Sequence, residues 1–141
     1  KTQGLDMFFD CAKELKKIFP NITLEIIGSG PDEAYFKNRA KNSSFHVAFH
    51  GYIPSDNKVK DIQKTWDIGI ALYIPEESNV SYYTDPSKIK GYLNLGIPVI
   101  ITNITFAKEV KKENAGIIID YGKKEQLIKK LPLKIETRKS A

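Results

Sequence analysis

Apolar positions along the chain alternate between helical and strand-like spacing. Residues 5–19 carry apolar side chains three and four positions apart, which predicts an amphipathic helix. Further helices are predicted at 32–42, 55–64, 85–96, 107–113 and 123–130. Between them lie short and almost wholly apolar runs, which predict strands at 24–27, 47–50, 68–73, 99–102 and 116–119.

The apolar character of these strands determines the expected fold class. A strand that is apolar throughout is buried on both faces, as in a parallel sheet covered by helices. We therefore expect an α/β, Rossmann-like domain over residues 1–131, with helices on both faces of a parallel sheet. Residues 132–141 are expected to form a basic polar tail. Because ligands bind beyond the carboxyl ends of such strands, the informative loops are 28–31, 51–55, 74–87 and 102–106.

The helix predicted at 85–96 begins with residues that favour an anion. Asp85 can cap the helix, and Pro86 suits its first turn, where no N–H is needed. Ser87 and Lys88 follow, with no carboxylate after the cap. Free N–H groups and the helix dipole then favour a bound anion such as phosphate. The alternative is an ordinary helix cap without a ligand.

A glycine-rich turn is the second candidate site. Gly28, Ser29 and Gly30 follow a predicted strand and precede a predicted helix, as in a dinucleotide-binding fingerprint. The third glycine of that fingerprint is replaced by Glu33, and Asp32 adds a second acid that would repel a pyrophosphate. A nicotinamide or flavin site is therefore not expected. The turn either lets a ligand approach the backbone or is purely structural.

Composition and charge narrow the classes of partner. The net charge of +5 and the pI near 9.2 favour anionic partners, although the excess lysines could simply keep the surface soluble. No apolar run approaches the roughly 20 residues of a membrane span. The single cysteine, Cys11, excludes an intramolecular disulfide and is expected to be a buried thiol rather than a nucleophile. A reducing cytoplasm suits this cysteine usage.

Other chemistry finds little support in the sequence. His46 and His50 have no partners at metal-ligand spacing, so no metal site is expected. Neither a nucleophile elbow nor a Walker loop is present, which argues against hydrolase and P-loop activity. Nucleic-acid binding would rest on charge alone. The aromatic side chains that either stack on a base or sugar or pack in the fold are Trp66, Tyr73, Tyr82 and Tyr83.

Five segments, in order along the chain, carry a family resemblance. They are residues 3–6, the strand and Gly-x-Gly-Pro turn at 24–31, the Phe-x-Gly segment at 47–53, the strand at 66–71, and the Pro-Ser-Lys helix with Gly-x-Pro-Val at 86–100. Together they resemble the carboxy-terminal, donor-binding domain of retaining glycosyltransferases of family 4. The resemblance covers essentially the whole chain and implies one half of a GT-B fold.

The resemblance implies a site for a nucleotide-diphosphate sugar, with no metal and no further cofactor. Residues implied near the ribose or diphosphate are Gly28, Ser29 and Gly30. Those implied at the base are Tyr52 and Ile53, and those implied at the phosphates and sugar are Asp85, Pro86, Ser87, Lys88 and Ile89. Positive side chains and helix N–H groups would stabilise the departing diphosphate. No catalytic residue is assigned.

The resemblance also implies an activity and a setting. The activity is hexosyl transfer to a glycan or lipid-linked acceptor, as in polysaccharide or lipopolysaccharide biosynthesis, in the cytoplasm or at the inner face of the membrane. A first strand would precede residue 1, and an acceptor-binding amino-terminal domain would belong to the same polypeptide. The chain alone is expected to bind donor weakly and to transfer no sugar. A nucleic-acid partner is not implied.

This sequence departs from the family pattern at three positions. The paired glutamates of the family would fall at 83 and 91, where this chain has Tyr83 and Gly91. The family's phosphate-binding lysine is replaced by Gln3, with Lys1 two residues earlier. A degenerate, non-catalytic scaffold that binds a nucleotide or sugar is therefore the alternative function. A flavodoxin-like signalling domain would need acidic strand ends or a hydroxyl-rich phosphate loop, and the chain has neither.

Overall fold

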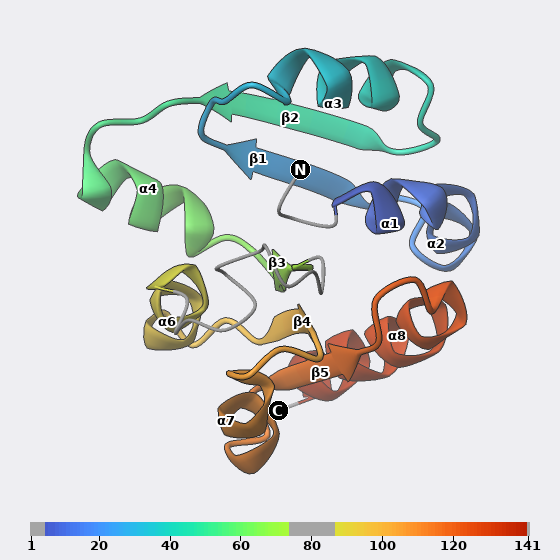
Figure 1. The fold of residues 1–141 in the computed structure, drawn as a ribbon, viewed down its shortest axis with the longest axis vertical. Coiled ribbons are helices and arrows are strands. Elements are labelled where there is room, and N and C mark those ends of the chain that lie inside the picture. Colours follow the sequence, from blue (N-terminus) through green and yellow to red (C-terminus); the bar gives the residue numbers. More distant parts are fainter. Residues whose placement is uncertain (1–4, 74–86, 141) are drawn as a thin grey trace.

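The computed structural model describes residues 5–73 and 87–140, with side chains described for 5–73 and 88–135. Helices and strands alternate along the chain (Figure 1). The helices are α1 Leu5–Asp10, α2 Ala12–Ile18, α3 Glu33–Lys41, α4 Asp56–Gln63, α6 Ser87–Asn94, α7 Ala107–Lys112 and α8 Lys124–Ser140. The strands are β1 Thr23–Ile27, β2 His46–Gly51, β3 Gly69–Ala71, β4 Val99–Thr102 and β5 Gly116–Ile119.

The strands pair only in parallel within the described part of the chain. β1 pairs with β2, and separately β4 pairs with β3 on one side and β5 on the other. The expected parallel α/β architecture is confirmed. The strands nevertheless divide into two hydrogen-bonded groups, β1-β2 and β3-β4-β5, because no described strand bridges β1 and β3.

Helices cover both faces of the strands, as the apolar runs predicted. Successive residues of β4 point to opposite faces, so Ile100 enters one cluster while Val99 and Ile101 enter another. The first core joins β1 and the β3-β4-β5 group to α1, α2 and α8, and includes Phe8, Leu15, Leu24, Leu72, Ile100, Ile119, Leu127 and Leu131. The second core joins the opposite face to α6 and α7, and includes Ala71, Ile89, Tyr92, Val99, Ile101 and Val110.

Local signals fix the ends of α4 and α6. The Ser55 hydroxyl accepts a hydrogen bond from the Lys58 backbone N–H at 3.3 Å and caps α4, as predicted. Gly96 ends α6 at a φ of +72°, and Ile97 N–H donates to the Tyr92 carbonyl at 3.0 Å. This left-handed glycine with a backward hydrogen bond is the usual way a helix stops.

The structure differs from the predicted helices at both ends of the chain. The segment 5–19 is divided at Cys11 into α1 and α2. Near the other end, the predicted end of the last helix at 130 is wrong, because α8 continues through Pro132 to Ser140. Leu131 is buried in the first core and Ile135, four residues on, packs against it. This packing offsets the roughly 3 kcal/mol that an interior proline costs a helix.

Candidate functional site

Two glycine turns meet at the carboxyl ends of β1 and β2. The Gly28 N–H donates to the Gly51 carbonyl oxygen at 2.8 Å, which holds the two turns side by side. The φ angles are +113° at Gly28 and +68° at Gly51, a region that glycine enters without strain. The structure therefore brings together the two segments that the family resemblance implies at the ribose or diphosphate and at the base.

The surface beside these turns is open and carries an aromatic ring. Tyr52, directly after β2, is 74% exposed, more than any other large apolar side chain that is described. Ile53 is half-buried and Ser29 is exposed. No atom of the described residues beyond the chain neighbours lies within 4 Å of a Cβ built on Gly28 or Gly30, so those residues leave the backbone of that turn accessible. A planar ligand could stack on the ring while its polar groups reach the turn.

The helix that follows the first turn starts with negative charge. Asp32 precedes α3 without forming a side-chain cap, and Glu33 stands in its first turn. The Glu33 carboxylate forms an ion pair with the Lys37 ammonium at 3.1 Å, one helical turn further on. This helix start therefore does not favour an anion, as the sequence predicted.

The start of α6 has the opposite character. Ser87 opens the helix, and its first turn contains no acidic residue. The Lys88 side chain reaches solvent, but burial among the protein atoms packed around it lowers the pKa of its ammonium. Ile89 is fully buried in the second core, so it can seat the helix start but cannot offer its side chain to a ligand. Asp85 and Pro86 lie outside the described residues.

The two glycine turns and the start of α6 lie at the same edge of the molecule, where the strands have their carboxyl ends. In a parallel arrangement, the helix that links β3 to β4 starts at the carboxyl edge and returns along the strands. In Figure 1, α6 lies on the side toward which the β1 and β2 arrows point. The glycine turns belong to β1 and β2, whereas α6 packs on β3 and β4. A ligand that contacts both groups would span the two sets of strands.

A buried hydroxyl that the sequence analysis did not single out joins two strand ends at this edge. Thr102, the last residue of β4, donates its hydroxyl to the Tyr73 carbonyl oxygen at 2.7 Å and is almost fully buried. The sequence signal for this residue was its position as the one polar side chain in the otherwise apolar run 99–102. Tyr73 itself is buried, and burial raises the pKa of its phenol. Of the two alternatives left open for Tyr73, packing in the fold is therefore the one that the structure supports.

Other singled-out side chains are structural. Trp66 is half-buried against the second core, with its ring centroid 5.9 Å from that of Tyr92. Cys11 is buried in the first core, and burial raises the pKa of its thiol to about 11, so it is not a nucleophile at neutral pH. Both observations confirm the structural alternatives. Tyr82 and Tyr83 lie outside the described residues.

Within residues 5–73 and 87–140, neither a cluster of three metal-ligating side chains nor a helix able to cross a bilayer is found. His50 Nε2 lies 3.0 Å from Glu25 Oε1 on the neighbouring strand. The imidazole is thus engaged with a carboxylate across the β1-β2 pair. His46 is exposed at the start of β2.

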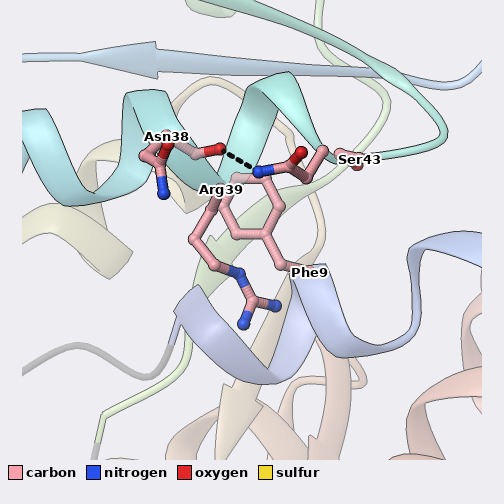
Figure 2. Close-up of a pocket in the computed structure, with 5 residues that line it drawn as sticks. Phe9, Asn38, Arg39 and Ser43 are labelled. Atoms are coloured by element: carbon pink, nitrogen blue, oxygen red, sulfur yellow. Dashed lines mark hydrogen bonds between the residues drawn. The ribbon is translucent and has the colours of Figure 1, made fainter.

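A hollow of about 210 Å³ lies away from this edge, between α1 and the end of α3 (Figure 2). Its walls are Phe9, Asn38, Arg39, Asn42 and Ser43. The Arg39 guanidinium lies 2.8 Å from the Asp10 carboxylate and 5.4 Å from the centroid of the Phe9 ring. Because this charge is already matched, the hollow is a helix junction and not a ligand site.

Comparison with known proteins adds one positive finding. The family model described as glycosyl transferases group 1 matches residues 1–133. The match includes both glycine turns, α6 and every strand of the structure. Among curated proteins, no sequence matches the chain. A parallel α/β fold over the same residues agrees with the family model, and the chain therefore belongs to the group 1 glycosyltransferases.

Proposed function

We propose that this chain is the donor-binding part of a glycosyltransferase and that it binds a nucleotide-diphosphate sugar at the carboxyl edge of its strands. The observation that carries the proposal is the pairing of Gly28 with Gly51 beside the exposed ring of Tyr52. The acid-free start of α6 at the same edge supplies the second half of the site. Membership of a sugar-transferring family supports this choice of ligand.

Each part of the proposed donor is assigned to residues whose chemistry suits it. The base stacks on Tyr52 beside Ile53, and the ribose lies against the backbone of Gly28, Ser29 and Gly30. The diphosphate and sugar lie at residues 85–89, where Lys88 and the free N–H groups of α6 receive negative charge. As the sugar leaves, the same groups stabilise the growing charge on the diphosphate.

The lowered pKa of Lys88 supports an anionic ligand. Protein atoms around the ammonium disfavour its charge. A phosphate placed beside it restores favourable electrostatics and raises the pKa of the ammonium again. Binding of the donor therefore takes up protons at alkaline pH, which gives the proposal a signature that a neutral ligand would lack.

The whole reaction is proposed to retain the configuration of the sugar and to use a glycan or lipid-linked acceptor, in polysaccharide-type biosynthesis on the cytoplasmic side of a membrane. An acceptor-binding domain of the same polypeptide would complete the enzyme. The 141-residue chain alone then binds donor without transferring sugar. Turnover by this chain would contradict the assignment of donor binding and acceptor binding to separate domains.

A non-catalytic scaffold is the second candidate, and Gly91 favours it. The resemblance places a glutamate at this position of α6, and outside the helix's own backbone no described residue has an atom within 4 Å of a Cβ built there. The described residues leave space for a longer side chain at position 91, but this chain has glycine there. If Gly91→Glu tightens donor binding, the position belongs to the site and the present chain carries a weakened version of it.

Calorimetric titration with uridine diphosphate and guanosine diphosphate tests the proposal. One of the two is expected to bind, and Tyr52→Ala should weaken that binding by about 1–3 kcal/mol, the usual worth of a base stacked on an aromatic ring. Leu133→Ala, which shortens an exposed apolar side chain on α8, is the control and should leave affinity unchanged. Binding of neither diphosphate to the folded chain would reject the donor site.

A further inference from the structure

Glu25 places a carboxylate inside β1, although charged side chains are uncommon in strands. Among the residues of the five strands that the structure describes, it is the one lysine, arginine, aspartate or glutamate. Its Oε1 atom lies 3.0 Å from Nε2 of His50 on β2, and each of the two side chains is 28% exposed. A carboxylate can only accept, so the imidazole donates this hydrogen bond. The contact therefore joins β1 to β2 in addition to their backbone ladder.

His50 is the extra residue of a β-bulge. β1 and β2 run side by side (Figure 1), and their pairing moves from Ile26 with Phe49 to Ile27 with Gly51, which leaves His50 without a partner in register. An inserted residue moves every later residue of its strand by one position relative to the neighbouring strand. Bulges re-aim side chains in this way and are frequent beside active sites. The bulge therefore decides which residue of β2 stands beside the turn that follows β1.

The bulge comes directly before the contact that joins the two glycine turns. Gly51 follows His50, and its carbonyl oxygen accepts the Gly28 N–H at 2.8 Å. Tyr52, which is 74% exposed, is the next residue of the chain. The hydrogen bond to Glu25 holds the His50 side chain, and the covalent backbone carries this restraint to the two residues that follow. The side-chain contact thus lies one residue from the glycine pair and two from the exposed ring.

These contacts favour a positioning role for His50 over a metal-binding one. Among the residues that the structure describes, no group of three side chains able to hold a metal ion is found. His46 stands four residues earlier in β2, which is about 13 Å along an extended strand. The Nε2 atom of His50 is already used by Glu25. The imidazole therefore acts on its own strand end.

We propose that His50 is a positioning residue for the nucleotide half of the donor site and that it acts through its hydrogen bond to Glu25. The inference rests on the proposed function for the identity of the ligand alone. Without the contact, the bulge moves more freely, the Gly51 carbonyl holds the Gly28 N–H less firmly, and the ring of Tyr52 is less fixed where the base would stack. The diphosphate half at α6 packs on other strands and is unaffected.

Amide hydrogen exchange at Gly28 tests the proposal without any ligand. Glu25→Met removes the acceptor and should speed this exchange by about two- to fivefold, the usual worth of a cross-strand polar pair. Glu25→Gln keeps an acceptor in place and should return exchange close to the parent rate. The Val99 N–H, which donates to the Ala115 carbonyl in the other strand group, reports that each variant is folded. Glu14→Met, the same substitution at an exposed site on α2, is the matched control and should leave Gly28 unchanged.

A double-mutant cycle assigns the effect to the contact itself. His50→Leu should speed exchange at Gly28 as much as Glu25→Met does. The two substitutions together should have no larger effect than either alone, because both remove the same hydrogen bond. Additive effects would show that the two residues act separately and would overturn the proposal.

Calorimetry provides a second readout that separates positioning from a general loss of structure. Glu25→Met should weaken binding of uridine diphosphate or guanosine diphosphate by about two- to fivefold. Affinity for inorganic pyrophosphate should stay the same, because this ligand is proposed to bind only at α6.

Two outcomes would count against the role of His50. They are unchanged exchange at Gly28 in folded Glu25→Met, and an equal loss of affinity for pyrophosphate and for the nucleoside diphosphates. Absence of nucleoside diphosphate binding by the parent chain would instead reject the proposed donor site. The exchange comparison at Gly28 would then still decide whether the contact positions the two turns.

Discussion

Gly116 is the residue at which one added methyl group should damage the fold most clearly. It pairs in register with Val99 across the β4-β5 ladder. A Cβ built on Gly116 overlaps the Val99 carbonyl oxygen and lies 2.9 Å from both its carbonyl carbon and its Cγ2. Because the obstacle is backbone, it cannot rotate away, and the two strands must separate to admit an alanine.

The size of the effect follows from three contributions. Overpacking of this kind costs about 1–3 kcal/mol, and loosening the nearby Val99 N–H to Ala115 carbonyl bond costs about 1 kcal/mol more. Alanine restricts the unfolded chain and returns about 0.4–1 kcal/mol. Gly116→Ala should therefore lower the free energy of unfolding by about 2–3 kcal/mol, which corresponds to a Tm lower by roughly 10 °C in a domain of this size.

Thermal unfolding followed by circular dichroism measures this effect, and Gly91→Ala is the matched control. Gly91 lies inside α6, and the described residues leave open space where its Cβ would stand. Alanine there favours the helix and should raise the free energy of unfolding by about 0.5–1 kcal/mol. The two variants should move Tm in opposite directions. A Gly116→Ala variant as stable as the parent chain would refute the close approach of β4 and β5 at this point.

Three further variants test the site and the packing. Lys88→Glu should weaken diphosphate binding in calorimetry without changing Tm. In the parent chain, affinity should fall as pH rises toward the ordinary lysine pKa of about 10, because the lowered pKa of Lys88 removes its charge earlier, and Lys88→Gln should abolish that dependence. Leu131→Ala should cost about 2–5 kcal/mol in denaturant unfolding because its side chain is buried in the first core, whereas Leu133→Ala on the exposed face should cost little. For Asp10, burial alone would raise the carboxyl pKa, but the Arg39 hydrogen bond and the Lys124 charge outweigh it and lower the pKa. This carboxylate therefore stabilises the fold above its ordinary pKa and loses that contribution as pH falls, so Arg39→Met should be less stable than the parent near neutral pH and should converge with it in acid.

The sequence predicted most closely the strands whose residues are almost all apolar. The runs at 99–102 and 116–119 match β4 and β5 residue for residue, because continuous apolar character is what a strand covered on both faces requires. The stop at Gly96 and the cap at Ser55 are likewise encoded within a few neighbouring residues. In each of these cases the local preference and the tertiary packing agree.

Elements that depend on distant contacts were predicted less well. Pro132 should end a helix by its local properties, but Leu131 and Ile135 carry α8 onward by packing in the first core. Tyr73 follows an apolar strand and precedes a polar loop, so its burial depends on helices far along the chain. The separation of β1 from β3 cannot be read from periodicity, because pairing partners are not encoded in the spacing of apolar residues.

The electrostatics of the two helix starts give the proposed donor an orientation. An anion at the start of α3 would meet the carboxylate of Glu33, which already uses Lys37 as its partner. An anion at the start of α6 would meet Lys88. Burial disfavours the charged form of this lysine, and a negative group beside it would stabilise that form. In the proposed site, the diphosphate therefore lies near α6 and the base near Tyr52. Because Tyr52 follows β2 and α6 packs on β3 and β4, the proposed donor in this orientation would contact both strand groups at once.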